Sequence, residues 1–231
     1  MAKFSKNSIC YTCNLKHNLF RFLTDDELKY INESRYEVHY NKGENIFKQG
    51  DAFTHIACLT YGMAKVYLEG ENDKNVILRL LKPVELIGSP GFQVDNRHHF
   101  SVVTIQDSRA CLIDANVFEQ VLKSNSSFNL EFIKYINNAT IRLFNKLTGL
   151  TGKHMHGRIA DALLYLSDQV YKKSSFTTNL SRQDIADMTA LTKESCIRIL
   201  KEFKDEGIIE YGSNSFNLLD KEKLEMISRV S

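Results

Sequence analysis

The chain has 231 residues, which exceeds the usual domain size of about 100 to 200 residues and leaves room for two modest domains. With 43% hydrophobic and 25% charged residues it has the composition of an ordinary globular protein rather than a disordered one, and its net charge of +2 neither indicates nor excludes a nucleic-acid partner. No apolar run reaches the roughly 18 residues that span a bilayer, and the opening MAKFSKNSICYTC lacks the apolar stretch of a secretory signal, so we expect a cytoplasmic protein with no membrane contact.

Short β-type segments follow one another between about residues 34 and 114. They are YEVHY, ENIF, HIACLTY, AKVYLEG, VILRLL, SVVTI and ACLI, and Gly, Asn and Asp separate them. Regular short strands of this kind predict an antiparallel sandwich or barrel. We expect the aromatic residues Phe47, Tyr61 and Tyr67 to pack in its core.

A long helix is predicted from Ser126, which is a suitable N-cap, because no proline follows and glycine returns only at Gly149 and Gly152. Its apolar positions alternate in spacings of three and four, as in the seam of a coiled coil. The seam residues are Ile133, Ile136, Thr140, Leu143, Leu147 and Leu150. The seam is shorter than three heptads, so it fits either a dimer interface or an intramolecular core helix.

The C-terminal part begins with a second amphipathic helix, GRIADALLYLSDQVY (157–171), followed by the polar loop KKSSFTTN. Residues 180–209 then predict a helix, a tight turn at Ala190 to Thr192, a second helix and a chain exit at Gly207. The residues expected to lock the two helices together are Ile185, Met188, Leu191, Ile197 and Leu200. The tail EYGSNSFNLLD contains two β-runs around a Gly-Ser-Asn turn, which predicts the wing of a winged helix-turn-helix.

If residues 193–204 form a recognition helix, its first residues face the major groove of DNA. Arginine bonds guanine bidentately and glutamate accepts from the cytosine amino group, so Glu194 and Arg198 together could read adjacent base pairs. The alternative for the same residues is an ordinary surface salt bridge between positions i and i+4. Arg182 and Gln183 begin the preceding helix, where backbone N–H groups and side chains meet phosphate, although a solvated helix cap has the same sequence.

The chain resembles the Crp/Fnr family of bacterial regulators, which includes the cyclic AMP receptor protein and the fumarate and nitrate reduction regulator. The resemblance covers nearly the whole chain in the same order. It is carried by KGENIFKQGD (42–51), YGMAKVY (61–67), the long helix, GRIADALLYL (157–166) and SRQDIADMTALTKESCIRIL (181–200). The first and last motifs are specific to the family, and the others support them.

The resemblance implies an α+β fold in three parts. Residues 1–125 would form an N-terminal arm and a sensory β-roll of the cyclic-nucleotide-binding type, which is a double-stranded jelly roll. Residues 126–153 would form the dimerisation helix and hinge, and residues 154–231 the winged helix-turn-helix. A homodimer would then bind double-stranded DNA at an inverted-repeat promoter site and act with RNA polymerase.

The resemblance also implies roles for single residues. Those matching Lys193, Glu194 and Arg198 contact base edges in the family, and those matching Arg182 and Ser195 approach phosphate. The function expected is therefore that of a sequence-specific DNA-binding transcription regulator, controlled by a signal sensed in the β-roll.

The segment LIGSPGFQVDNRHHFSVV (86–103) departs from the members that bind cyclic AMP. Those members place a Gly-Glu pair and an Arg-Ser pair around the phosphate. Here Ser89 and Pro90 stand where the acid would fall, and Phe100 precedes Ser101 in place of arginine. The bidentate partner of the phosphate is therefore missing.

The long helix departs from the cyclic AMP binders as well. It offers Leu143 and Phe144 where they present Thr-Ser to the purine. We therefore expect the signal not to be cyclic AMP. The alternative is that Arg97 takes the place of the missing arginine after a loop shift.

Five cysteines in a chain without a secretion signal indicate thiols or ligands rather than a disulfide framework. Cys10 and Cys13 form a Cys-x-x-Cys pair, and Cys111 matches a cluster-binding cysteine of the oxygen-sensing branch of the family. The next cysteine expected in that branch is missing, and His17 lies near its place. An iron–sulfur cluster or zinc ion would need these four residues or a ligand from outside the chain, so the alternative hypothesis is a metal-dependent redox or oxygen sensor.

The other hypothesis for the same cysteines is an N-terminal arm whose thiols are redox-inert, with Cys111 simply buried in a strand. Cys58 and Cys196 are predicted to be ordinary core residues.

Two other classes of function fit the sequence less well. A cupin-like metal enzyme would need a His-x-His on a strand, but His154 and His156 follow the long helix, and His98 and His99 are adjacent and diverge on a strand. We therefore expect the protein not to be an enzyme. A protein-binding adaptor would use the helix-turn-helix without DNA, and salt-sensitive DNA binding would argue against it.

Overall fold

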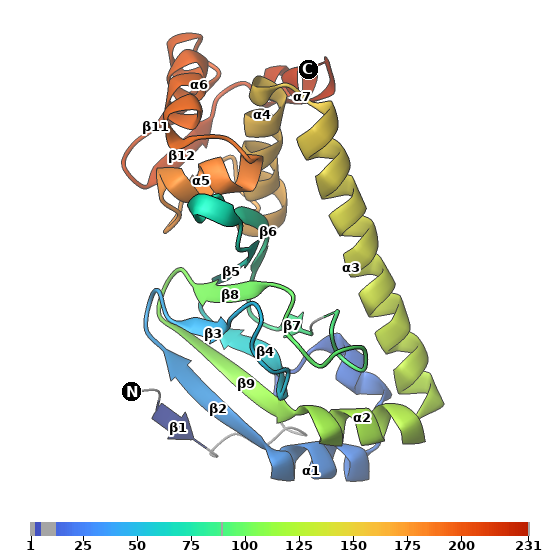
Figure 1. Cartoon of the computed structure of the whole chain (residues 1–231). Helices are drawn as coiled ribbons and strands as arrows, with labels where there is room; N and C mark the ends of the chain where they lie inside the picture. Colours follow the sequence, from blue (N-terminus) through green and yellow to red (C-terminus); the bar gives the residue numbers. More distant parts are fainter. Residues whose placement is uncertain (1–2, 6–12, 89, 231) are drawn as a thin grey trace. The chain divides into compact units, whose positions relative to one another are not determined.

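A computed structural model describes residues 3–5, 13–88 and 90–230 of the chain (Figure 1). The chain divides into two compact units, one formed by Met1–Leu68 and Leu80–Ile141, the other by Glu69–Arg79 and Arg142–Ser231. The division falls inside the long helix α3 (Ser126–Gly152). None of the helices in the described ranges is both long enough and apolar enough to cross a membrane.

The N-terminal unit is built on two β-sheets, which confirms the predicted β-roll (Figure 1). The first has the strand order β1-β2-β9-β4-β7, and the second has the order β3-β8-β5-β6, of whose last strand only Leu80 and Leu81 belong to this unit. Their bounds are β1 (Lys3–Ser5), β2 (Arg35–Tyr40), β3 (Asn45–Phe47), β4 (His55–Tyr61), β5 (Ala64–Leu68), β6 (Val76–Leu81), β7 (Leu86–Ile87), β8 (Ser101–Thr104) and β9 (Ser108–Asp114).

Short helices cover one face of the first sheet. They are η2 (Asn18–Phe22), α1 (Asp25–Ser34) and α2 (Ala115–Ser124), which the sequence reading did not predict. Thr24 and Glu27 form a capping box at the start of α1, and Asp114 caps α2. The helices bury aromatic residues in one cluster with the first half of α3, among them Phe20, Phe118, Phe128 and Phe132.

The YGMAKVY motif owes its glycine to a close approach of backbone. Gly62 has a φ of +89°, and a Cβ there would lie 2.2 Å from the Ser108 Oγ and 2.5 Å from the Asp107 carbonyl oxygen. The prediction that Tyr61 is a core residue is wrong, because the β4–β9 register shifts between Leu59 and Tyr61 at the strand end. The Tyr61 ring is exposed, and the Arg109 guanidinium lies 5.1 Å from its centre.

The C-terminal unit has the predicted winged helix-turn-helix. The helix expected at 157–171 is α4 (Met155–Tyr165), continued by a π-helical turn, η4 (Leu166–Tyr171). The predicted helix pair is α5 (Arg182–Thr189) and α6 (Lys193–Asp205). The wing strands are β11 (Ile209–Tyr211) and β12 (Ser215–Leu218). The chain also forms α7 (Lys221–Val230), which was not predicted.

The segment predicted as a polar loop contains a strand, β10 (Ser175–Thr177), which pairs with β12 and gives the sheet order β10-β12-β11. One aromatic residue decides this outcome. The Phe176 ring is buried, 5.8 Å from the Phe216 ring and 4.8 Å from the Tyr171 ring. Its polar neighbours on the strand face solvent, so the average hydrophobicity of the segment is low although one face of the strand is buried.

The prediction for the helix-turn-helix core is right except at one position. Ile185, Met188 and Leu200 are buried, and Leu191 is partly buried. Ile197 is 42% exposed, and Ile199 takes the core position instead. The buried stripe of α6 is Cys196, Ile199, Leu200 and Phe203, with the spacings of three and four that define one helix face.

Candidate nucleic-acid interface

Local hydrogen bonds define both helices of the helix-turn-helix. Ser181 caps α5 and forms a capping box with Asp184. Ala190 has the left-handed conformation, φ 51°, and ends α5, and the Leu191 N–H donates to the Ala186 carbonyl 3.0 Å away. The Thr192 hydroxyl then accepts from the Ser195 N–H and starts α6. The tight turn predicted at these residues is therefore two helix caps placed back to back.

The first turns of α6 expose the side chains predicted to contact bases. Lys193 and Glu194 are exposed, and neither forms a side-chain hydrogen bond or ion pair within the described residues. The Arg198 guanidinium donates to the Glu202 Oε1 2.7 Å away, so its ion pair is with Glu202 and not with Glu194. The surface salt bridge considered as the alternative for Glu194 and Arg198 is thus absent from the described part of the chain.

Glu202 also contacts His156 of α4, with 2.7 Å between the His156 Nε2 and the Glu202 Oε2. The hydrogen bond from His156, followed by that from Arg198, lowers the pKa of the Glu202 carboxyl. The Glu202 carboxylate therefore holds Arg198 along the exposed side of α6. In a complex with DNA, the O6 and N7 of a guanine would have to replace this carboxylate as the acceptor.

The three residues assigned to phosphate have other partners in the free chain. The Arg182 guanidinium lies over the rings of Tyr211 and Phe216, at 5.0 and 4.7 Å, and its Nη2 donates to the Gly212 carbonyl 2.5 Å away. The Arg182 Nη1 is buried without a hydrogen-bond partner. The Gln183 amide donates to the Asp187 Oδ1 2.8 Å away, and the Ser195 Oγ accepts from the Thr192 hydroxyl. Arg182 therefore ties the start of α5 to the wing.

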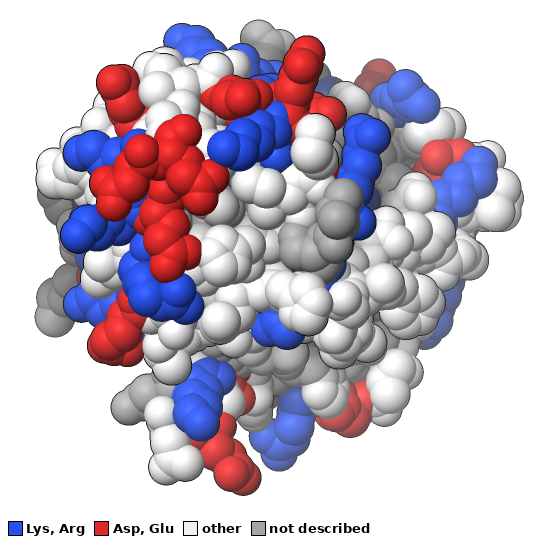
Figure 2. Space-filling model, turned by 90° about the horizontal axis from the view of Figure 1, so that it is seen from above, with Lys and Arg blue, Asp and Glu red and all other residues white. Residues whose placement is uncertain are grey.

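Acidic and basic side chains are interspersed around this unit. The exposed cations of α6 are Lys193, Arg198, Lys201 and Lys204. Figure 2 shows Lys and Arg side chains beside Asp and Glu side chains, without a uniform basic surface on the face that it presents. Attraction to phosphate would therefore be local to α6 and its cap.

Lys146 of α3 is a partly buried contact of α5 that sequence reasoning missed. Its Nζ donates to the Met188 carbonyl 2.5 Å away, at the end of α5. Burial lowers the pKa of Lys146 to about 8, although Asp161 opposes the shift. A lysine between two apolar seam positions looks like a solvated residue in the sequence, and no local signal shows that it caps another helix.

The predicted dimer seam of α3 is largely uncovered in the single chain. Ile133, Ile136, Leu143 and Leu147 are exposed, as is Thr140, and Leu150 is partly buried. Further exposed apolar side chains of the same helix were not predicted, namely Leu130, Ile141 and Phe144. A row of large apolar side chains on one helix indicates a surface that another molecule covers.

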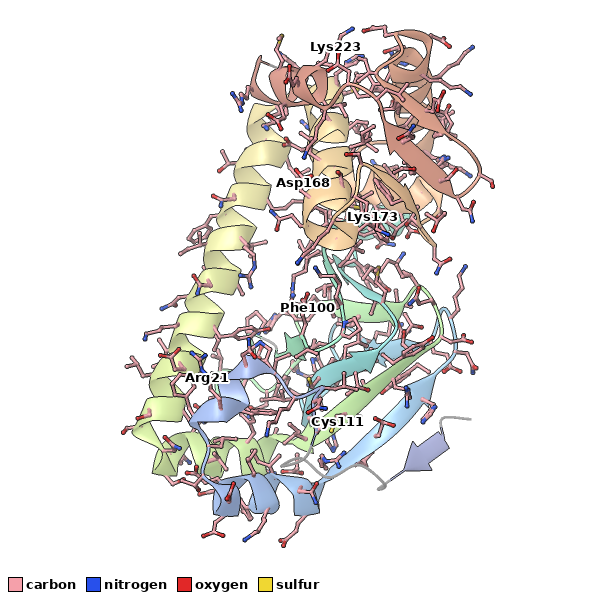
Figure 3. The ribbon with its side chains drawn as sticks, turned by 180° about the vertical axis from the view of Figure 1, so that it is seen from behind. Arg21, Phe100, Cys111, Asp168, Lys173 and Lys223 are labelled. Carbon is pink, nitrogen blue, oxygen red and sulfur yellow. The ribbon has the colours of Figure 1, made fainter. Side chains whose placement is uncertain are left out.

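The segment that departs from the cyclic AMP binders packs onto the β-roll. Ser89 lies outside the described residues. Phe100, labelled in Figure 3, is partly buried. The Ser101 Oγ accepts from the Gln49 N–H 2.8 Å away. The Arg97 Nη1 donates to the Gly50 carbonyl 2.8 Å away. Arg97, considered as a substitute for the missing arginine, is therefore bonded to the backbone.

Aromatic residues surround His98 beside this segment. The imidazole is 3% exposed and lies 4.1 Å from the Phe47 ring and 4.9 Å from the Phe53 ring. Its Nδ1 is buried without a hydrogen-bond partner. Burial lowers the pKa of His98 to about 4, and the charge of Asp51 only partly opposes the shift. His98 is therefore neutral at pH 7, while the adjacent His99 is exposed and pairs with Asp95.

The candidate metal ligands are only partly described. Cys10 lies outside the described residues. The Cys13 Sγ accepts from the Leu15 N–H, and the His17 Nδ1 accepts from the Leu19 N–H 3.1 Å away. No group of three or more His, Cys, Asp and Glu residues in the described ranges could hold a metal ion. Cys58 and Cys196 are buried, as predicted.

Two family profiles match the sequence of this chain. The profile described as a cyclic nucleotide-binding domain matches residues 37–125, and that described as a Crp-like helix-turn-helix domain matches residues 157–227. The transcriptional regulatory protein btr of Bordetella pertussis is 24% identical over 224 residues, 94% of this chain and 92% of that protein. Electron transport regulator A of Shewanella oneidensis is 22% identical over 227 residues, 95% of this chain and 90% of that protein.

Solved structures share the fold. FixK2 of Bradyrhizobium japonicum superposes with a TM-score of 0.76 at 18% identity, over 84% of this chain and 98% of that chain. The c-di-GMP-responsive global regulator CLP of Xanthomonas campestris superposes with a TM-score of 0.72 at 16% identity, over 84% and 99% of the two chains.

Proposed function

Because the chain belongs to the Crp/Fnr family of transcription regulators, we propose that it binds an inverted-repeat promoter site as a homodimer, under the control of a signal other than cyclic AMP. Members of this family are not enzymes, so the cupin-like metal enzyme is excluded. The observation that carries the proposal is the uncovered start of α6, where Lys193, Glu194 and Arg198 are all exposed behind a helix, a tight turn and α5.

In the proposed complex these three side chains contact base edges in the major groove. Arg198 exchanges its Glu202 partner for guanine, and Glu194 accepts from a cytosine amino group. Arg182, Gln183 and Ser195 contact phosphate. For Arg182 a phosphate contact requires the guanidinium to leave the rings of Tyr211 and Phe216.

The proposed homodimer is held by the seam of α3. Ile133, Leu143 and Leu147 are 48%, 45% and 58% exposed, so covering each of them gains about half of the roughly 1.5 to 3 kcal/mol that full burial of such a side chain contributes. A two-fold dimer presents two copies of α6 to successive major grooves. RNA polymerase is the partner through which such a dimer would act on a promoter.

A signal other than cyclic AMP is supported by the packing of the β-roll. Phe100 brings no charge to the phosphate position, and Arg97 is bonded to Gly50. Leu143 and Phe144 carry no hydroxyl for the purine.

Selection of bound duplexes from a random-sequence DNA pool tests the proposal. We expect a palindromic consensus whose half-sites lie about one helical turn apart, roughly 34 Å from centre to centre. Affinity for it, measured by fluorescence anisotropy, should fall steeply as salt is raised. An enriched site without two-fold symmetry would contradict the dimer, and the absence of any enrichment would contradict sequence-specific binding and favour the adaptor.

A further inference from the structure

Two cysteines predicted to be unrelated lie directly opposite each other in the β-roll. Cys58 of β4 and Cys111 of β9 are Cα partners in the antiparallel ladder. Directly opposed residues project to the same face of a sheet, with Cα atoms about 4.5 to 5.5 Å apart. A disulfide needs Cα atoms about 4.4 to 6.8 Å apart, so the backbone already satisfies this requirement without moving a strand.

A buried cation lies against one of the two thiols. Arg35 of β2 is 4% exposed, and its Nη1 donates to the Cys111 Sγ 3.4 Å away. The Asn32 Oδ1 accepts from the Nε and Nη2 of the same guanidinium, each at 3.2 Å, and so orients it. A guanidinium does not lose its proton, so Arg35 can stabilise the negative charge that develops on the Cys111 sulfur and on the leaving oxygen as the thiol reacts.

The two thiols differ in access, as the two partners of a redox pair do. Cys111 is partly exposed, whereas Cys58 is 2% exposed and donates weakly to the Leu15 carbonyl, with 3.8 Å between the Sγ and the oxygen. Cys111 can therefore meet a small oxidant, and Cys58 can react only with a group already inside the protein. Figure 3 labels Cys111 on the sheet of the N-terminal unit.

We propose that Cys58 and Cys111 form a peroxide-reactive dithiol, which is the signal input of the regulator. The Cys111 thiolate attacks one peroxide oxygen, the O–O bond breaks, and water leaves after proton uptake, which gives a sulfenic acid. The Cys58 sulfur attacks the Cys111 sulfur, the S–OH bond breaks, and the Cys58 proton leaves with the hydroxide as a second water. Two thiols are oxidised to one disulfide, and one hydrogen peroxide is reduced to two waters.

The N-terminal segment connects this pair to the helix proposed to form the dimer. Formation of the disulfide takes the Cys58 Sγ away from the Leu15 carbonyl. Two residues later His17 packs edge-on against Tyr135 of α3, with ring centres 5.1 Å apart. The Phe20 ring lies 6.3 Å from that of Phe128, also on α3. The effect of these contacts on DNA binding rests on the proposed function, whereas the thiol chemistry is independent of it.

The test uses the full chain, reduced and desalted without oxygen and treated with one equivalent of hydrogen peroxide. Free thiols are then alkylated, and the disulfide-linked peptides are mapped by mass spectrometry. We expect one linkage, Cys58 to Cys111, which dithiothreitol reverses. Linkage of Cys111 to Cys10 or Cys13, or modification of neither thiol, would overturn the proposal.

Variants separate the roles of the two thiols. Cys58→Ser should leave a Cys111 sulfenic acid that dimedone traps, and Cys111→Ser should leave Cys58 unmodified. Arg35→Gln should slow the reaction of Cys111 on the order of tenfold. Cys196→Ser is the matched control and should behave as the unmodified chain, because burial raises the pKa of the Cys196 thiol to about 12. Equal reactivity of Cys58 and Cys111 in the single variants would contradict the assignment.

DNA affinity of the same samples separates this inference from the proposed function. A mapped disulfide with altered affinity for the selected site supports both. A mapped disulfide with unchanged affinity removes the signalling role. If neither redox state binds any DNA, the proposed function fails while the dithiol stands. Zinc or iron in the purified protein that is lost in the Cys58→Ser variant would make the thiols metal ligands and overturn the dithiol.

Discussion

In the C-terminal unit the polar side chains proposed to read DNA are exposed, whereas in the N-terminal unit His98 and Ser101, near the expected ligand position, are buried and packed against the protein itself. Lys193 and Glu194 have no side-chain partner in the described residues, and Arg198 has one at the surface. His98 is enclosed by phenylalanine rings, and Ser101 is bonded to the backbone.

The difference in exposure follows from the different tasks proposed for the two units. A surface that contacts base edges must keep its hydrogen-bond donors in water until DNA replaces that water. Helix caps and helix packing alone can position such donors. The conformation and the protonation state of a buried imidazole or thiol instead depend on the residues packed around it. A small chemical change there therefore alters the packing of the unit. The comparison leads us to expect that changes in the C-terminal unit affect binding and that changes in the N-terminal unit affect stability or response.

The largest effect should come from the exposed apolar seam, which belongs to neither class of polar site. Leu143→Asp would place an unpaired charge in the dimer interface and weaken it by several kcal/mol, about 3 to 5. Sedimentation at micromolar concentration should then show a monomer. Val94→Asp is the matched control, since Val94 is a large apolar residue that is 80% exposed outside α3, and that variant should remain dimeric. A dimer that survives Leu143→Asp would remove the seam as the interface.

Acidification should destabilise the N-terminal unit through His98. Its pKa is about 4 in the folded protein and about 6.5 when unfolded, so the unfolded state binds more protons between these values. The free energy of unfolding should therefore fall as the pH is lowered from 6.5 to 4, by up to about 3 kcal/mol. Urea unfolding at several pH values measures this fall.

Two histidine variants sharpen this prediction. His98→Phe should lose the part of the fall that His98 causes and keep the part due to His55, whose pKa burial also lowers. The exposed neighbour provides the control, because His99→Gln should retain the whole fall. Equal acid sensitivity in both variants would show that the imidazole of His98 is not the responsible group.

A smaller effect, confined to binding, is expected at α6. Arg198→Ala should weaken DNA binding by about 1 to 3 kcal/mol and relax the preference at one base position. Arg182→Ala should weaken all sequences alike. Anisotropy titrations against the selected site and its single-base variants distinguish the two patterns, and unfolding of the Arg198 variant should be unchanged because the side chain is exposed. If the preference survives Arg198→Ala, the register assigned to α6 is wrong.

Addition of cyclic AMP should have no effect, because we expect the protein not to bind it. Phe100 and not an arginine directly precedes Ser101, and the guanidinium of Arg97 is bonded to the Gly50 carbonyl. Calorimetry should detect no heat of binding at micromolar protein. Micromolar affinity would mean that the segment around Arg97 rearranges to replace the missing phosphate partner.

Several elements could be predicted because their signals are local. The cap residues Ser181 and Thr192 and the apolar spacing of α6 locate the helix-turn-helix without knowledge of any distant residue. Even there the prediction was wrong at Ile197, although the spacing of Cys196, Ile199, Leu200 and Phe203 marks the buried face of α6 in the sequence as well. Strand β10 was missed because its single inward residue, Phe176, packs on Phe216 of the distant strand β12, with which β10 pairs.

The sequence by itself determined the order of the elements, the winged helix-turn-helix and the side chains offered to DNA, since these depend on residues a few positions apart. Tertiary structure alone decided that Cys58 faces Cys111, that Arg35 reaches the latter thiol, and that Lys146 caps α5. Strand register and helix packing place such pairs, and both depend on the summed burial of many distant residues rather than on any local pattern.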